Sequence, residues 1–197
     1  MKFDFNKTLT LENDCVLLRC LEQNDFEKLL PFSENEPHLW SFSLTPASGA
    51  KNLKNYINKA IESRVKEEAY PFIVVDKKKG VVAGCTRFYE IDLQHDVLSL
   101  GYTWYGKEFQ RTGLNRNCKY LLLTYAFETL KCERVEFRAD LRNKKSIESM
   151  KSIGCTVEGV LRNNCKAAYG RRDSMVLSIL RDEWEQKVKK QLESKLY

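Results

Sequence analysis

The chain has 197 residues, of which 43% are hydrophobic and 30% are charged. This length and composition are those of one globular domain with a sizeable core, and they exclude a disordered chain. No apolar run reaches the roughly 18 residues that a membrane-spanning helix needs, and the first residues, MKFDFNKTLTLEND, lack the apolar centre of a secretion signal. We therefore expect a cytoplasmic protein that has no membrane partner.

The seven cysteines include no C-x-x-C pair, and the only histidines are His38 and His95. Such a pattern does not suit a zinc site, and an odd number of cysteines does not suit a disulfide framework. We expect reduced cysteines that act as small core residues, and we expect no metal.

The net charge of +6 is unevenly distributed along the chain. Residues 1–100 carry 13 basic and 15 acidic side chains, a net charge of −2, whereas residues 101–197 carry 20 and 12, a net charge of +8. The basic second half favours an anionic ligand on that part of the molecule.

The predicted elements begin with a strand over 15–21, CVLLRCL, and a helix that follows it. Three prolines then predict an irregular segment over 31–46. Apolar residues spaced three and four apart predict a helix over 50–69, with Val65 on its inner face.

The middle of the chain predicts a β-hairpin, PFIVVD and VVAGCTRFYE around the turn KKKG, in which Gly84 marks a bulge or a close backbone approach. A further strand over 97–104 leads through the loop QRTG into a helix over 114–130. The strand RVEFRAD follows, and Asn143 then caps a short helix that Gly154 ends. The strands on either side of the 114–130 helix should therefore be parallel, with a right-handed connection.

Two more strands, CTVEGVLR and SMVLSIL, and an amphipathic helix over 182–195 complete the chain. This order of elements predicts an α+β fold with helices on both faces of a mixed, mostly antiparallel sheet of about six to seven strands. We expect a single domain over 1–197 whose core spans about 12–181.

The strongest motif is QRTGLN, Gln110 to Asn115, which lies between a predicted strand and a predicted helix. A loop of the form [QR]-x-x-G-x-[GA] presents bare N–H groups and the positive end of a helix dipole to a pyrophosphate. Asn115 stands where a small residue is usual, so the hexapeptide alone is better explained as a simple glycine turn before a helix. The nearby GYTWYGKE resembles a nucleotide-hydrolase loop, but Glu108 replaces the hydroxyl that such a loop uses to bind magnesium.

Four stretches between Leu98 and Trp184 extend this motif: LSLGYTWYGKEFQRTGLNRNCKYLLLTYAFE, RVEFRADLRNKKSIESMKSIGC, VEGVLR and RRDSMVLSILRDEW. Together they resemble the GNAT superfamily of N-acetyltransferases and, within it, the ribosomal-protein N-terminal (Rim-type) branch. The resemblance implies acetyl-CoA as cofactor and CoA as product, bound in a V-shaped opening between a splayed pair of parallel strands.

The resemblance also implies which residues hold acetyl-CoA: the strand before the loop would pair with the pantetheine, and the loop would bind the pyrophosphate. The expected cofactor-binding residues are Leu100, Tyr102, Thr103, Trp104, Gln110, Arg111, Thr112, Gly113, Leu114, Asn115, Arg116, Asn143 and Ser146. The basic residues near the loop are either phosphate ligands or solvated surface charges: Lys107, Arg111, Arg116, Lys119, Lys144 and Lys145. Arg111 and Arg116 are the two for which we expect phosphate contacts.

The implied reaction is direct attack of an amine on the thioester, with backbone N–H groups stabilising the oxyanion. Met150 replaces the tyrosine that the family often uses as an acid. The expected proton donor is therefore Ser146, water or none, because a thiol with a pKa near ~8.5 is a tolerable leaving group.

Candidate bases are Glu90, which we favour, and Glu36, His38 and His95, although each is also explained as a surface residue. An α-amine with a pKa near ~7.7–8 is easier to deprotonate at neutral pH than a lysine near ~10.4. Without a recognisable base motif, we therefore expect a protein N-terminus or a small-molecule α-amine as acceptor.

The irregular segment, with Trp40 and Phe42, is expected either to line the acceptor pocket or simply to cover the sheet. The alternative function is a non-catalytic CoA-binding or RNA/ribosome-associated module. The basic second half motivates it, but its basic residues are not interleaved with aromatic ones as in a nucleic-acid platform. Nucleic acid is therefore not an expected partner, and a homodimer is left open.

Overall fold

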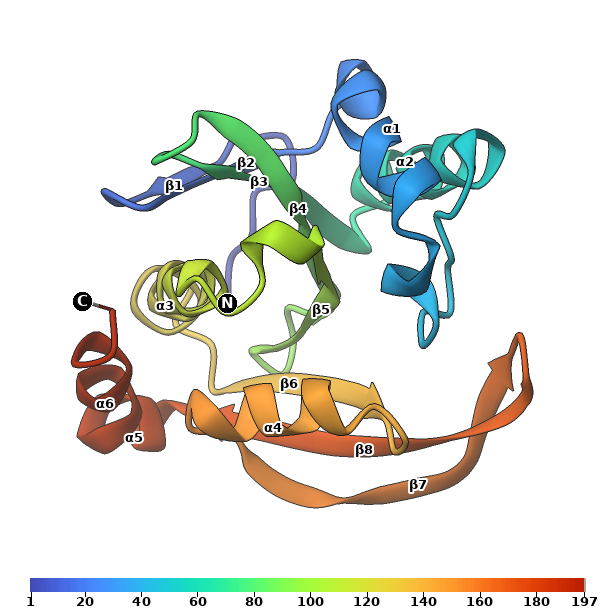
Figure 1. Ribbon diagram of the computed structural model, residues 1–197. Coiled ribbons are helices and arrows are strands. Elements are labelled where there is room, and N and C mark those ends of the chain that lie inside the picture. The colour runs from blue at the N-terminus through green and yellow to red at the C-terminus, as the bar shows by residue number, and fades with distance from the viewer. Residues whose placement is uncertain (197) are drawn as a thin grey trace.

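Eight strands form one continuous sheet in the computed structural model, which describes residues 1–196 (Figure 1). In spatial order they are β1 (Thr10–Glu12), β2 (Val16–Cys20), β3 (Ala69–Asp76), β4 (Val81–Asp92), β5 (Val97–Tyr105), β6 (Arg134–Asp140), β8 (Gly170–Leu180) and β7 (Thr156–Ala167). All neighbours are antiparallel except β5 and β6, which are parallel as expected. The sequence predicted about six to seven strands. The additional strand is β1, a three-residue edge strand without an apolar run that could have indicated it.

Helices cover both faces of the sheet, which confirms the predicted architecture (Figure 1). One face carries α1 (Phe26–Asn35) and α2 (Ala50–Val65), and the opposite face carries α3 (Leu114–Thr124), which continues through a π-helical turn, Tyr125–Thr129. The remaining helices are α4 (Lys144–Ser152), which lies against β6, and a C-terminal succession of α5 (Arg181–Glu183), a π-helical turn (Trp184–Val188) and α6 (Lys189–Glu193). None of the helices within residues 1–196 has the length and apolarity that crossing a bilayer requires.

Two apolar cores lie on the two faces of the central strands. The larger lies beneath α3 and includes Phe72, Phe88, Leu122, Phe137 and Trp184. The smaller lies beneath α1 and α2 and includes Leu29, Trp40, Leu53, Tyr56 and Trp104. Burial of each such large side chain contributes about 1.5–3 kcal/mol, so both faces of β4 and β5 are held rigidly.

Two local predictions in the first half are wrong. Pro31 does not break the chain but lies inside α1. Because Pro31 is exposed, the missing hydrogen bond falls on the solvent side of the helix, where water can reach the carbonyl left without a partner. Val65, the last residue of α2, is 79% exposed rather than on a buried face.

The prediction for Gly84 is confirmed in both of its forms. The pairing of β3 and β4 shifts register beside Gly84, which is a bulge. A Cβ atom at Gly84 would lie 2.0 Å from the carbonyl oxygen of Trp104, so only glycine permits this approach of β4 to β5.

Candidate active site

The parallel strands β5 and β6 are paired over only three residues each, Val97–Ser99 with Arg134–Glu136. Beyond Ser99 the two strands diverge, β5 staying with β4 and β6 with β8. The outer edge of β5 from Leu100 to Tyr105 therefore has no neighbouring strand. Such an edge presents backbone N–H and C=O groups with which an extended ligand can pair.

A bulge in β5 lies just beyond the point of divergence. Tyr102 and Thr103 together lie opposite a single residue of β4, Thr86. Tyr102 has a left-handed backbone with φ of 51°, which costs a non-glycine residue roughly 1–3 kcal/mol. A bulge bends its strand and re-aims its backbone groups, and here it does so at the deep end of the opening.

The QRTG loop lies at the mouth of the opening and ends in Gly113, with φ of 88°. A Cβ at this position would meet no atom within 4 Å, so the space beside the loop is open. The N–H of Asn117 donates to the Gly113 carbonyl, and the N–H groups earlier in the first turn of α3 have no such intrahelical acceptor. The Leu114 N–H meets the Thr112 hydroxyl at 3.4 Å. The open space, the other N–H groups of the first turn and the positive end of α3 together suit a pyrophosphate.

Side chains of the loop are linked to α4. The Gln110 amide donates to the Tyr105 carbonyl at 2.9 Å and accepts a hydrogen bond from Lys145. The Asn115 amide donates to the Ser149 hydroxyl at 3.1 Å, which explains why an asparagine stands where a small residue is usual. Asn143 caps α4, as predicted, by accepting the N–H of Ser146 at 3.1 Å.

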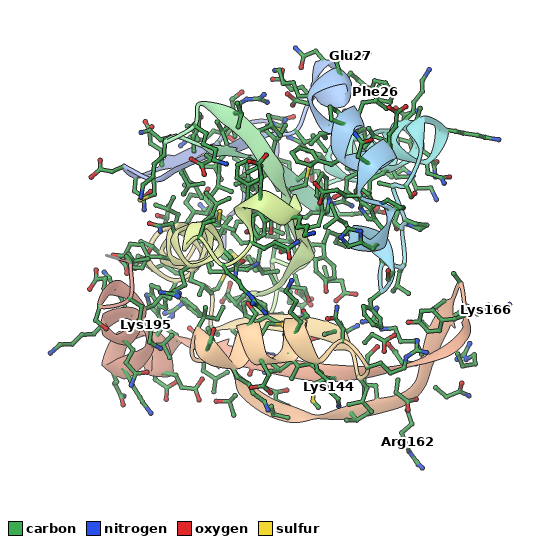
Figure 2. The ribbon with its side chains drawn as sticks, viewed as in Figure 1. Phe26, Glu27, Lys144, Arg162, Lys166 and Lys195 are labelled. Carbon is green, nitrogen blue, oxygen red and sulfur yellow. The ribbon has the colours of Figure 1, made fainter. Side chains whose placement is uncertain are left out.

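The basic residues around the loop are placed differently from one another. Arg111 and Thr112 are exposed on the loop, and Lys144 is exposed at the start of α4 (Figure 2). Arg116, however, donates to the Lys195 carbonyl at 2.7 Å, so its guanidinium is held by the C-terminal segment. Of the two arginines for which phosphate contacts were expected, Arg111 is therefore the one that is not held by the C-terminal segment.

Lys119 is the residue for which the sequence interpretation was furthest from the structure. It is not a surface charge near the loop but is only 5% exposed. Its ammonium donates to the Thr103 hydroxyl on β5 at 3.0 Å and lies 5.7 Å from the ring centroid of Phe137 on β6. The charge therefore lies between the two strands where they diverge, at the floor of the opening.

The surroundings of Lys119 contain no compensating anion. Burial lowers the pKa of Lys119 to about 8, and the thiols of Cys118 and Cys155 oppose this shift. Burial also raises the pKa of each of these thiols to about 12, so both stay neutral. None of the ion pairs within residues 1–196 involves Lys119. An ammonium has three donors and Thr103 accepts one, which leaves capacity for a ligand.

The candidate bases are spread over the molecule. Glu90 lies within β4, where the pairing with β5 is irregular between Tyr89 and Asp92. Its carboxylate accepts a hydrogen bond from the Ser99 hydroxyl at 3.0 Å and pairs with Arg138 at 3.6 Å. The Glu36 carboxylate accepts the backbone N–H of Lys107 at 2.7 Å, while His38 and His95 are exposed. Only Glu90 contacts both strands that border the opening, and its role as base stays a prediction.

A second buried cation, Arg87, escaped the sequence interpretation. It lies on β4 and is 5% exposed. Its guanidinium lies 4.2 Å from the ring centroid of Tyr102 and 5.5 Å from that of Tyr56 on α2. The adjacent Thr86 hydroxyl contacts that of Thr103 at 2.8 Å. Thr103 also accepts from Lys119, so Thr86 lies on the same face of the sheet as Lys119. Because successive side chains of a strand point to opposite faces, Arg87 lies on the other face.

The splayed parallel pair, the bulge and the glycine-led helix define the acetyl-CoA-dependent class of acyltransferases. A family model described as "Acetyltransferase (GNAT) domain" matches residues 16–156. The chain therefore belongs to the GNAT acetyltransferases.

Individual relatives agree with this assignment. A solved structure from T. thermophilus, described as an acetyltransferase, is 31% identical, with a TM-score of 0.85 over 95% of this chain and 97% of that one. YdaF of Bacillus subtilis, named as a ribosomal N-acetyltransferase, is 32% identical over 106 residues, 54% of this chain and 57% of YdaF. A GCN5-related N-acetyltransferase from Brucella melitensis, at 23% identity, shares the fold with a TM-score of 0.90 over 98% of this chain and 88% of that one.

Proposed function

We propose that this enzyme transfers the acetyl group of acetyl-CoA to a primary α-amine, carried by a protein N-terminus or by a small molecule. The observation that carries the proposal is the opening between β5 and β6, with the Gly113 loop at its mouth and the Lys119 ammonium at its floor. The ribosomal acceptor in the name of YdaF supports a protein N-terminus.

The residues of the opening fit acetyl-CoA in three parts. The unpaired edge of β5, from Leu100 to Trp104, would pair with the pantetheine. The loop and first helical turn, 110–116, would hold the pyrophosphate through backbone N–H groups, with Arg111 as its side-chain cation. Asn143 and Ser146, at the start of α4, would close the other side.

The chemistry follows from the positions of these groups. Backbone N–H groups at the Tyr102 bulge would stabilise the oxyanion that forms when the amine nitrogen bonds to the acetyl carbon. As the C–S bond breaks, its electron pair stays on sulfur, and Lys119 gives that sulfur a proton. The amine loses its own proton to water or to Glu90, and Lys119 is reprotonated from solvent. Lys119 thus takes the place of Ser146 as the favoured acid, and Met150 has no proton to give.

The nature of the acceptor follows from the proton that must be removed. An α-amine with a pKa near ~7.7–8 requires about 1 kcal/mol to deprotonate at neutral pH, whereas a lysine near ~10.4 requires about 4–5 kcal/mol. Among the candidate bases only Glu90 borders the opening, and it is already paired with Arg138. This arrangement favours the α-amine.

Two measurements test the proposal. CoA at saturation should raise the melting temperature, because a ligand that binds only the folded state stabilises it. Acetyl-CoA should release thiol with at least one member of a panel of α-amines. Cofactor binding without turnover of any amine would favour the non-catalytic alternative, and absence of both would contradict the proposed function.

The acceptor class is tested with matched peptides that differ in presenting an α-amine or a lysine ε-amine. For the α-amine, kcat/KM should rise with pH through the pKa of the amine itself. A preference for the ε-amine at pH 7 that is lost in Glu90→Gln would contradict the α-amine and establish Glu90 as the general base.

A further inference from the structure

The second buried cation, Arg87, lies on the face of β5 away from α3, beside the bulge. Its guanidinium is stacked against Tyr102, which is itself the left-handed residue of the bulge. Tyr56 from α2 forms the other wall. Tyr102 is 37% exposed, so one wall of this site reaches the surface. The site therefore adjoins the reacting end of the opening without lying in the path of the pantetheine.

Within residues 1–196, this site contains a cation to which no carboxylate is paired. The Arg87 Nε, the Trp104 Nε1 and the Trp40 Nε1 are all buried without a hydrogen-bond partner within residues 1–196. The two indoles are in contact, with ring centroids 5.1 Å apart. No ion pair in the same part of the chain includes Arg87. A buried N–H group without an acceptor is costly, and the Arg87 Nε belongs to a cation that has no paired carboxylate within the described residues.

The Tyr56 hydroxyl connects these donors. Burial raises the pKa of Tyr56, whereas Arg87 and Trp104 both lower it, which places its hydroxyl near both groups. Burial thus keeps this hydroxyl protonated, so its oxygen can accept hydrogen bonds from Trp104 and Arg87 but supplies no negative charge to balance the guanidinium. Arg64 shows the contrast: it also lies over a tyrosine ring, Tyr70, but its guanidinium donates to the carbonyl of Phe5 at 2.8 Å and to that of Lys7 at 3.2 Å.

A carboxylate is the group that best completes this arrangement. It is planar, it accepts two parallel hydrogen bonds from a guanidinium, and it has lone pairs left for neighbouring N–H and O–H donors. Arg87 is only 5% exposed, so a charge-assisted pair formed with its guanidinium would be strong. A phosphate is a poorer match, because its higher charge would face one guanidinium stacked against the rings of Tyr56 and Tyr102.

We infer that Arg87, with Tyr56 and Trp104, forms a binding site for a carboxylate of the amine acceptor, so that the enzyme selects acceptors with an acidic group near the reacting amine. This inference rests on the proposed function. Arg87 acts here as a specificity residue, through its charge and its planar fork of donors.

The test uses pairs of peptides that begin with the same alanine and differ in one carboxylate. Alanyl-aspartyl amide is compared with alanyl-asparaginyl amide, and alanyl-alanine with alanyl-alanine amide, so that a side-chain and a terminal carboxylate are distinguished. For one pair, the carboxylate member should have a kcat/KM about tenfold higher, mainly through a lower KM. Arg87→Met should reduce that ratio to about one, and Arg87→Lys should keep part of it, because lysine retains the charge without the planar fork.

Three controls keep the outcome decisive. Arg64→Met removes an arginine whose hydrogen bonds are satisfied, and it should leave the ratio unchanged. Arg87→Met should fold with an equal or higher melting temperature, because replacing an uncompensated buried charge by an apolar side chain is often stabilising. It should also bind CoA like the parent, which separates this inference from the proposed function.

The N-acetylated peptides are also titrated against the protein, with and without CoA, by tryptophan fluorescence. Tighter binding of the carboxylate member, lost in Arg87→Met, supports the site even if no peptide is turned over. Equal kcat/KM within both pairs, equal binding within both pairs, or a preference that survives in Arg87→Met would overturn it.

Discussion

The two faces of β5 each hold a buried cation, and the two cations are built for different tasks. Lys119 reaches from α3 to Thr103, and burial lowers its pKa to about 8. Arg87 lies among aromatic rings on the other face and makes no ion pair within residues 1–196. A lysine near neutrality can give up and regain a proton, whereas a guanidinium offers a fixed charge with a planar fork of donors.

Strand β5 thus separates proton transfer on one face from recognition of the acceptor on the other. The bulge at Tyr102 brings both cations close to the same backbone, while the alternation of side chains keeps them on opposite faces. On the α3 face the missing partner is an anion that forms during the reaction, namely the thiolate. On the α2 face it is an anion that the acceptor brings with it.

The largest effect is expected at the mouth of the opening, on the α3 face alone. Gly113→Asp should abolish CoA binding, because it places a side chain and a negative charge where backbone N–H groups face the pyrophosphate. Gly80→Asp is a matched control, since Gly80 also has a positive φ, of 69°, and open space around it. Calorimetry should show parent-like binding for the control, and parent-like binding for Gly113→Asp would remove the cofactor from this loop.

Replacement of Lys119 should lower kcat rather than raise KM. General acid catalysis contributes roughly 100-fold or more, and because a thiolate is a tolerable leaving group we expect Lys119→Met to lose about 10- to 100-fold. The exposed Lys151, which pairs with Glu148, provides the control Lys151→Met. An unchanged kcat in Lys119→Met would show that Lys119 is not the general acid, and the proposed difference in role between the two cations would be wrong.

The same replacement should change stability in a pH-dependent way. The pKa of Lys119 is about 8 in the folded state and about 10.4 unfolded, so between these values the unfolded state binds more protons and stability should rise with pH. Below about pH 8 the lysine is charged in both states and the burial cost is fully present. Lys119→Met should therefore be more stable than the parent at pH 7, by at most about 3 kcal/mol, and should lack the alkaline rise. Urea unfolding at several pH values measures this, and parallel pH profiles for the two proteins would contradict it.

The smallest effect is expected at Met150, which lies where the family often has a tyrosine and is 7% exposed. With Lys119 in place, Met150→Tyr adds an acid that the reaction does not need, so kcat should change by less than about threefold, although the extra volume costs some stability. A steady-state assay at pH 7 is sufficient. A large gain in kcat would show that the parent lacks an acid and that Lys119 does not serve as one.

Local periodicity predicted seven of the eight strands and the order of helices, because those elements have regular apolar patterns. It failed where the outcome depends on distant groups. Arg116 points to the carbonyl of Lys195, 79 residues away, and nothing near the loop indicates that contact. Pro31 is tolerated inside α1 because it faces solvent, which depends on where α1 packs.

The sequence around Lys119 and around Arg87 contains patterns that indicate their burial. Lys119 is followed at the third, fourth and seventh positions by Leu122, Leu123 and Ala126, so it begins a buried helical face. Arg87 is the only charged residue in GVVAGCTRFY, a run typical of a strand covered on both faces. Their burial could therefore be predicted, but the absence of a carboxylate around them depends on the packing of α2, α3 and β6.

The most direct test of the division between the two faces is proton release on cofactor binding. Calorimetric titrations of CoA and of desulfo-CoA at pH 7, in buffers of different ionisation enthalpy, count the protons released. If the Lys119 ammonium faces the sulfur, CoA should release up to one proton, because the amine and the thiol together retain one proton in place of two. Desulfo-CoA should release only the protons that come from its phosphates, which CoA shares. Lys119→Met should abolish the difference between the two ligands, while Arg87→Met keeps it. Equal proton release by the two ligands, or a difference that persists in Lys119→Met, would contradict the account.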